Sequence, residues 1–295
     1  MVSKDVISKL KSSCIGIVIR QKGNPRPWVV GGTGFVIDPE GYFITATHVV
    51  KALDRKITEL KKNGSKEIKL GVTHTEIIKG KAQIITLDIL YYTALNITIS
   101  NEPYFGPKKY DLTIGKIKGK HNGLPFLTIK SPCKLDLLNE IAMCGYPGGS
   151  VTLNVNDDDS GMKLSPLLQI GKIASIMPID HTINPTGIQT DIIGTGGSSG
   201  SPIVDTNDGE VISVAQNIIP TPVQIPTTKD KEEHIGYAQI GMIFGVSNYF
   251  LQPIVKDTLK FLKQEMNDEG YPKSGKDSET FFRNITIKHD TDSIN

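Results

Sequence analysis

The stretch Thr195-Gly196-Gly197-Ser198-Ser199-Gly200-Ser201-Pro202-Ile203-Val204 decides how this sequence is interpreted. Residues 196–201 are three glycines and three serines, and an apolar run typical of a β-strand follows them. Glycines permit backbone conformations and close approaches that a side chain would block. A serine in such a turn can expose its hydroxyl while neighbouring N–H groups point at one spot, as acyl transfer requires. Gly/Ser clusters are more often plain turns, so the stretch needs support from the rest of the chain.

A hairpin ending in a histidine gives the first support. The run from Gly32 to Val50 reads Gly-Thr-Gly-Phe-Val-Ile-Asp-Pro-Glu-Gly-Tyr-Phe-Ile-Thr-Ala-Thr-His-Val-Val. It predicts a strand over 35–37, a tight turn over 38–41 and a returning strand over 42–46, which places His48 at a strand end. A lone histidine in that position is usually structural, so His48 becomes a catalytic candidate only together with the serine stretch.

An aspartate between these two segments completes the set. Asp111 opens an apolar strand in Tyr110-Asp111-Leu112-Thr113-Ile114. An aspartate there is ordinarily a cap or turn residue. However, the three candidates follow one another as His, Asp, Ser, and the same triad occurs in other chain orders on other scaffolds. The order favours a two-barrel architecture.

The chain resembles trypsin-like (chymotrypsin-fold) serine proteases, particularly the HtrA-like branch, over roughly residues 13–266. Four motifs carry the resemblance: the histidine hairpin, the Asp111 strand, the serine turn, and Gly245-Val246-Ser247-Asn248 before the last helix. It implies an all-β fold of two six-stranded antiparallel β-barrels with a C-terminal helix. We expect a first lobe over 1–120, a second lobe over 121–266, and an unstructured polar tail over 267–295.

The resemblance also implies a role for each candidate. Ser199 would be the nucleophile, because it alone has Gly197 two residues before it, Gly200 after it and Pro202 three after it. His48 would be the general base, Asp111 would orient the imidazole, and the backbone N–H groups of Gly197 and Ser199 would form the oxyanion hole. Ser201 stands where the family usually has a second glycine, and a side chain there could distort the oxyanion hole.

Specificity is predicted from the residues around the serine turn. Ile193 lies six residues before Ser199, where enzymes that cut after Lys or Arg carry an acidic residue. We therefore expect Ile193, Gly194, Val214 and Ala215 to line a substrate pocket for small or medium apolar residues.

The function implied is that of a serine endopeptidase acting on protein or peptide substrates through an acyl-enzyme. One alternative is a catalytically impaired protease fold that serves as a binding or regulatory module. Another is an esterase or acyltransferase on a different scaffold, which would need the order Ser, Asp, His. The histidines after Ser199, His234 and His289, lack a recognisable context for that order.

The composition gives no support for nucleic-acid, membrane or metal-binding functions. A formal net charge of +2 over 295 residues, without a basic face, gives no sign of a nucleic-acid or membrane partner. The three cysteines are Cys14, Cys133 and Cys144, and their wide spacing favours free thiols over a disulfide framework or zinc site. The acidic segment 154–161 lacks the glutamate that closes a calcium loop. We expect no metal and no cofactor.

The sequence also gives expectations for the cellular location and the oligomeric state of the protein. The first residues lack the apolar core of a signal peptide, and no run approaches the roughly 18 apolar residues of a membrane span. We therefore expect a cytoplasmic protein. The segment after the last helix is too short and polar for a PDZ domain, so we expect a monomer. Helices are predicted over 3–12, over 51–63, and from Ser247 or Asn248 to about residue 266.

Overall fold

The computed structural model describes residues 2–22, 29–78, 81–99, 109–121, 123–148, 165–182, 184–218, 221–225, 234–238, 240–268 and 284–287. The acidic segment 154–161, considered above for calcium, lies outside these residues, as does His289.

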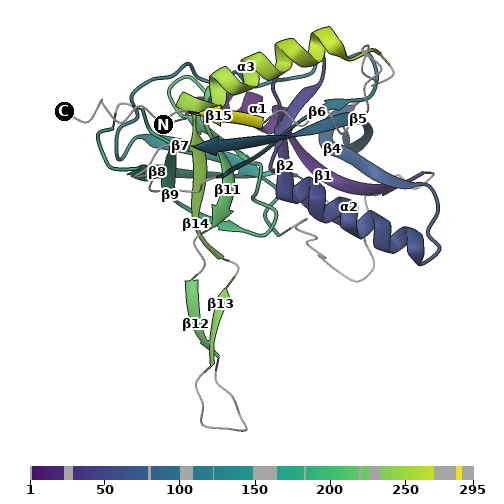
Figure 1. The fold of residues 1–295 in the computed structure, drawn as a ribbon, viewed down its shortest axis with the longest axis horizontal. Coiled ribbons are helices and arrows are strands. Elements are labelled where there is room, and N and C mark those ends of the chain that lie inside the picture. The colour runs from purple at the N-terminus through teal and green to yellow at the C-terminus, as the bar shows by residue number, and fades with distance from the viewer. Residues whose placement is uncertain are drawn as a thin grey trace.

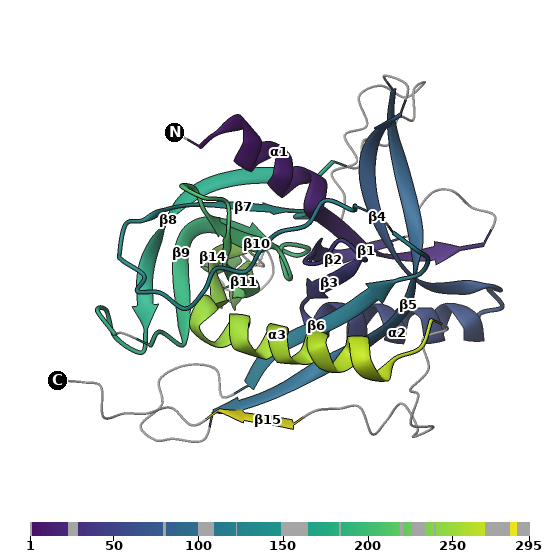
Figure 2. The same cartoon turned by 90° about the horizontal axis from the view of Figure 1, so that it is seen from above.

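The first half of the chain forms a closed six-stranded antiparallel barrel. Its sheet runs in the order β5-β4-β1-β2-β3-β6, and a further pairing of β5 with β6 closes the ring. The strands are β1 (Cys14–Gln21), β2 (Val29–Val36), β3 (Tyr42–Thr45), β4 (Ile68–Ile78), β5 (Lys81–Ile99) and β6 (Lys109–Ile117). In Figure 2, β4 and β5 extend beyond the barrel as a long arm.

The second half forms another closed barrel, in the order β10-β11-β14-β9-β8-β7. Its strands are β7 (Glu140–Gly145), β8 (Leu167–Met177), β9 (Gly187–Thr195), β10 (Pro202–Asp205), β11 (Val211–Ile218) and β14 (Ile240–Ser247). The pair β12 (Thr221–Ile225) and β13 (His234–Ala238) projects away from this barrel as a separate hairpin (Figure 1). The two-barrel fold expected from the sequence is confirmed.

In the described part of the chain, three helices accompany the barrels: α1 (Lys4–Ser13), α2 (Thr47–Lys62) and α3 (Asn248–Glu265). The side chain of Ser3 caps α1 by accepting a hydrogen bond from the backbone N–H of Val6. Helix α2 begins four residues before the predicted start, so His48 lies in its first turn and not at a strand end. Helix α3 has the predicted bounds and lies across both barrels in Figures 1 and 2.

Three apolar cores explain this arrangement. One fills the first barrel and includes Phe43 and Val72, and another fills the second barrel and includes Ile141 and Ile188. The third lies where the barrels meet and combines residues of both with the inner face of α3, for example Leu251. Burying a Leu side chain fully stabilises a protein by about 1.5–3 kcal/mol, so this third core fixes the two barrels against each other.

Part of the C-terminal segment has regular structure. Residues 284–287, inside the region expected to be unstructured, form β15 (Asn284–Ile287). This strand pairs in parallel with Asn96–Ile99 of β5, so it adds to the outside of the antiparallel ring. Backbone hydrogen bonding to an existing strand supplies the order that the polar composition of this segment does not predict.

Among the described helices, none is long and apolar enough to cross a bilayer.

Candidate active site

His48 lies in the first turn of α2, directly after β3, and Asp111 lies on the neighbouring strand β6 of the first barrel. Strand β3 pairs with β6, with Thr45 opposite Thr113, and the chain enters α2 directly after β3. His48 therefore lies beside Asp111, the third residue of β6. Asp111 accepts a hydrogen bond from the backbone N–H of His48 at 2.9 Å and forms a short contact through its other oxygen with Nδ1 of the imidazole.

These contacts favour the ionised form of Asp111. Burial acts to raise the pKa of this carboxyl, but the hydrogen bonds from His48 and Thr47 and the attraction to a charged imidazole outweigh burial. The net effect is a pKa below the usual value for aspartate. An anion beside Nδ1 favours the tautomer that carries its proton there, which leaves Nε2 able to accept one.

The serine turn connects β9 to β10 and is held by Thr33 of the first barrel. The hydroxyl of Thr33 donates to the carbonyl of Gly197 at 2.8 Å, and its backbone N–H donates to the carbonyl of Ser199 at 2.9 Å. Gly200 has φ +85°, and a Cβ built there would lie 2.0 Å from the carbonyl oxygen of Thr33. Only glycine allows the turn to approach the first barrel so closely.

The hydroxyl of Ser199 is directed at β11. It donates to the carbonyl of Gln216 at 3.4 Å. In the described part of the chain, no hydrogen bond of 3.5 Å or less joins it to His48. Gln216 is the extra residue of a bulge, because Ala215 pairs with Gly245 and Asn217 with Phe244. Bulges of this kind re-aim backbone and side-chain groups beside active sites.

Two backbone N–H groups of the turn remain free. Within the described chain, neither Gly197 N–H nor Ser199 N–H donates a backbone hydrogen bond. The carbonyl of Gly196 accepts a hydrogen bond from the N–H of Gly148 at 2.5 Å. Because carbonyl and N–H point to opposite sides of a trans peptide, the Gly197 N–H points away from Gly148. Unpaired backbone N–H groups beside a serine are the type of donor that an oxyanion hole requires.

Comparison with protein families identifies this arrangement. Residues 32–214, more than half of the chain, match the model described as "Trypsin-like peptidase domain". The chain belongs to the trypsin-like peptidase family. No curated protein matches it.

The solved structures similar to this peptidase include HtrA-type proteases. The structure "HtrA-type protease AlgW with tripeptide" is 15% identical, has a TM-score of 0.48, and is matched over 87% of this chain and 63% of its own. "Crystal structure of Deg5" is 18% identical, with a TM-score of 0.47, over 85% of this chain and 90% of its own. The peptidase described here thus spans less than two thirds of the length of AlgW.

Ser201 of this peptidase departs from the family pattern without filling the turn. Its side chain is directed at β7, where a Cβ on Gly145 would lie 2.1 Å from its Oγ. Ser201 is fully buried, and its hydroxyl has no partner in the described part of the chain. The space left by the missing side chain at Gly145 therefore accommodates the side chain of Ser201.

The expected substrate pocket is only partly at the surface. Ile193 is 57% exposed, whereas Val214 lies in the core between the barrels and Ala215 in the core of the second barrel. Gly194 is also buried. Met242, which the sequence analysis did not identify, pairs with Ile193 across β9 and β14 and is 42% exposed. The apolar surface beside the turn is therefore built on Ile193 and Met242, and only the strand register reveals the second of them.

Metal ligands and thiols do not add to the site. Among the described residues, no group of three or more His, Cys, Asp or Glu side chains could hold a metal ion. All three cysteines are free thiols. Cys14 and Cys144 are buried where the two barrels meet.

Proposed function

We propose that this trypsin-like peptidase is a serine endopeptidase in which Ser199, His48 and Asp111 form the catalytic triad. The observation that carries the proposal is the ionised Asp111 bound to His48, in a structure whose serine turn keeps two N–H groups free. A base oriented by a third group, next to a serine with oxyanion donors, is the constellation that acyl transfer uses.

The chemistry would proceed in two halves. His48 Nε2 takes the proton of Ser199 as Oγ attacks the peptide carbonyl, and the N–H groups of Gly197 and Ser199 bind the oxyanion. His48 then gives that proton to the departing amine, which leaves an acyl-enzyme. A water molecule, activated by His48, hydrolyses the ester and restores the serine. The Ser199 hydroxyl must first leave the Gln216 carbonyl and turn towards His48.

The Gln216 carbonyl would then become available to the substrate. It lies 3.4 Å from Ser199 Oγ and is unpaired in the β11–β14 ladder because of the bulge. A backbone N–H of an extended peptide can bind such an acceptor, as in other cases of strand addition. Ile193 and Met242, which pair across β9 and β14, offer an exposed apolar surface with no charged group of their own, which favours small or medium apolar side chains at the cleaved bond.

A fluorophosphonate probe tests the nucleophile. We expect one covalent adduct per chain on Ser199, located by peptide mass spectrometry and absent from Ser199→Ala. Ser198→Ala is the matched control, since Ser198 is the neighbouring serine and, among the described residues, its Oγ accepts a hydrogen bond only from Thr195 N–H. Labelling that survives Ser199→Ala would refute this assignment.

A peptide library tests the specificity separately. Cleavage should follow apolar residues, and Met242→Lys should shift the profile towards acidic ones. A profile dominated by Arg or Lys before the cleaved bond would contradict the proposed pocket without affecting the triad.

The second candidate is a catalytically impaired protease fold that acts as a binding module. The contact between Ser199 and Gln216, in place of one with His48, favours it. A folded wild type that neither reacts with the probe nor cleaves the library, yet binds peptides, would support this reading.

A further inference from the structure

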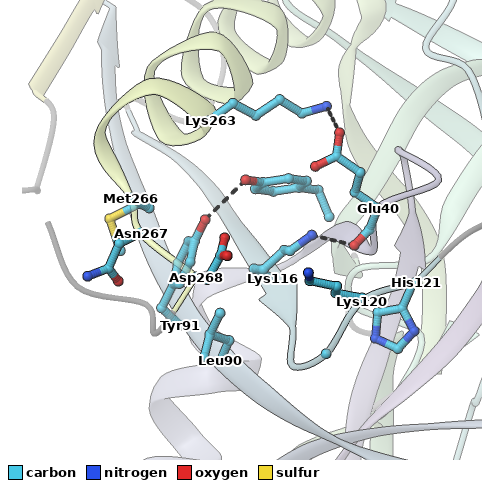
Figure 3. A pocket seen from close by; sticks show the side chains of 12 residues that line it. Glu40, Leu90, Tyr91, Lys116, Lys120, His121, Lys263, Met266, Asn267 and Asp268 are labelled. Atoms are coloured by element: carbon cyan, nitrogen blue, oxygen red, sulfur yellow. Dashed lines mark hydrogen bonds and ion pairs between the residues drawn. The ribbon is translucent and has the colours of Figure 1, made fainter. Parts of the chain in front are cut away.

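A cavity of about 560 Å³ lies at the end of α3, far from the serine turn. Figure 3 shows its walls, which come from β3 and the turn before it, β5, β6 and the turn after it, and the end of α3 with the residues that follow. Tyr42 and Lys116 face each other across β3 and β6. Lys116 follows Asp111 by five residues on the same strand, a distance of about 16 Å. The cavity is therefore separate from the proposed catalytic site, although the same two strands carry both.

Three ammonium groups line this cavity, and they differ in how they are neutralised. Lys263 forms ion pairs with Asp38 and Glu40, both at 2.8 Å. Lys116 and Lys120 have no carboxylate within 4.0 Å in the described part of the chain. Lys116 instead donates to the backbone carbonyl of Glu40 and stands 4.4 Å from the centre of the Tyr42 ring.

The surroundings of Lys116 leave its positive charge poorly compensated. Burial lowers the pKa of Lys116, and only the more distant acids Glu40, Asp38 and Asp268 oppose this effect. Of these, Asp38 and Glu40 already bind Lys263, and Asp268, which also lines the cavity, is exposed to solvent. A partly desolvated ammonium without a carboxylate partner is a favourable position for an anion.

The wall of the cavity opposite these lysines differs from theirs in polarity. Leu90, Tyr91 and Met266 line it with mostly apolar atoms. The Tyr91 hydroxyl donates to that of Tyr42 at 3.3 Å, which leaves the proton of Tyr42 available to a ligand. His121 lies at the mouth, with Nε2 bound to the carbonyl of Lys118 at 3.0 Å. A cavity of this volume is typical of small-molecule sites.

We propose that this cavity binds a small phosphate monoester with an apolar or aromatic body. The phosphate lies between Lys116 and Lys120, whose two unpaired charges match its charge of about −1.5 to −2 at neutral pH. The apolar body packs on Tyr91 and Met266. This site is independent of the proposed proteolytic activity.

Titration calorimetry of the full chain with phenyl phosphate tests the proposal. We expect saturable binding at one site per chain, and an affinity at least about tenfold lower in Lys116→Gln and in Lys120→Glu, because each removes a charge-assisted contact. Lys120 is exposed and unpaired, so Lys120→Glu keeps the test valid if Lys116→Gln does not fold. The matched control is Lys134→Gln, whose lysine pairs with Asp136 at the surface away from the cavity and should leave binding unchanged.

Two further ligands separate the parts of the proposal. Inorganic phosphate should bind more weakly than phenyl phosphate, because it lacks the apolar body, and benzoate should bind more weakly because it carries a single charge. If inorganic phosphate or benzoate bound as tightly as phenyl phosphate, the phosphate monoester assignment would be contradicted. Absence of saturable binding, or binding that both lysine variants retain, would overturn the site itself.

Discussion

Asp111 binds His48 at two points, the backbone N–H and the Nδ1 of the ring. The backbone bond fixes the start of α2, and the ring bond fixes the imidazole. Asp111→Asn keeps the size of the side chain but replaces an acceptor with a donor on one side, which favours the wrong imidazole tautomer. We expect the turnover number to fall by about 10⁴ while the fold is retained. Steady-state kinetics with an unchanged circular dichroism spectrum would check this, and a loss of less than tenfold would contradict the orienting role.

The same carboxylate links stability to pH. The pKa of Asp111 in the folded protein is below the value of 3.8 for the free side chain. The contribution of this carboxylate to the free energy of unfolding is therefore fully present above pH 3.8. Below that pH the unfolded chain takes up the proton first, and the contribution is lost as the pH falls through the folded pKa. The difference in free energy of unfolding between the wild type and Asp111→Asn should therefore be constant from pH 5 upwards and shrink below about pH 4. Urea unfolding at pH 5 and pH 3 measures it, and a difference that grows on acidification would contradict the lowered pKa.

Among the elements, α2 shows where sequence patterns are limited. The sequence predicts this helix from residue 51, because Thr47-His48-Val49-Val50 contains three β-branched residues. In the structure, Val49 and Val50 are buried with Leu53 against the first barrel, so packing overrides their strand preference. The two barrels were expected from the resemblance to trypsin-like proteases, and α3 from a capping residue and the helical spacing of its apolar residues. The early start of α2 depends on contacts with β6, which lies over sixty residues further along the chain.

The contact between β7 and β10 offers a test at the element scale. A Cβ at Gly145 would lie 2.1 Å from Ser201 Oγ and 2.9 Å from Thr33 Oγ1. Gly145→Ala should therefore lower the free energy of unfolding by about 1–3 kcal/mol through overpacking. Ser201→Ala removes a buried hydroxyl that has no described partner, so it should have little effect alone.

The double variant decides whether the two sites are coupled. Gly145→Ala with Ser201→Ala should recover about 1 kcal/mol of the loss, since the closest of the two clashes is removed. Denaturant unfolding of the four proteins completes the cycle. Additive effects within about 0.3 kcal/mol would show that Ser201 is not what occupies the space at Gly145.

Over the whole molecule, the site could be predicted from the sequence only in part. The roles proposed for His48, Asp111 and Ser199 rest on local motifs and on the order of these residues along the chain. The partner of the Ser199 hydroxyl and the exposure of Met242 do not, because each depends on a bulge or register between strands. The cavity beside Lys116 is likewise formed by segments that no local motif connects, from Glu40 to Asp268.

The junction between the barrels makes a prediction about the three thiols. Cys14 and Cys144 are fully buried in the shared core, and the Cys14 thiol donates to the carbonyl of Cys144 at 3.3 Å. Burial also raises the pKa of Cys14, which further suppresses its reactive thiolate. Cys133 is only partly buried. With a chromogenic disulfide reagent at neutral pH, we therefore expect one thiol to react quickly, and this fast phase to disappear in Cys133→Ser.

The two remaining thiols report on whether the barrels separate. If the shared core opens only when the whole protein unfolds, both should react at one rate, and its dependence on urea should match that of global unfolding. Because the proposed triad takes His48 and Asp111 from one barrel and Ser199 from the other, such cooperativity would hold the catalytic geometry in place. A slow phase that is independent of urea would show that the barrels part locally in the native state. In that case the contacts of Thr33 with the serine turn, and not the shared core, would be what holds the site together.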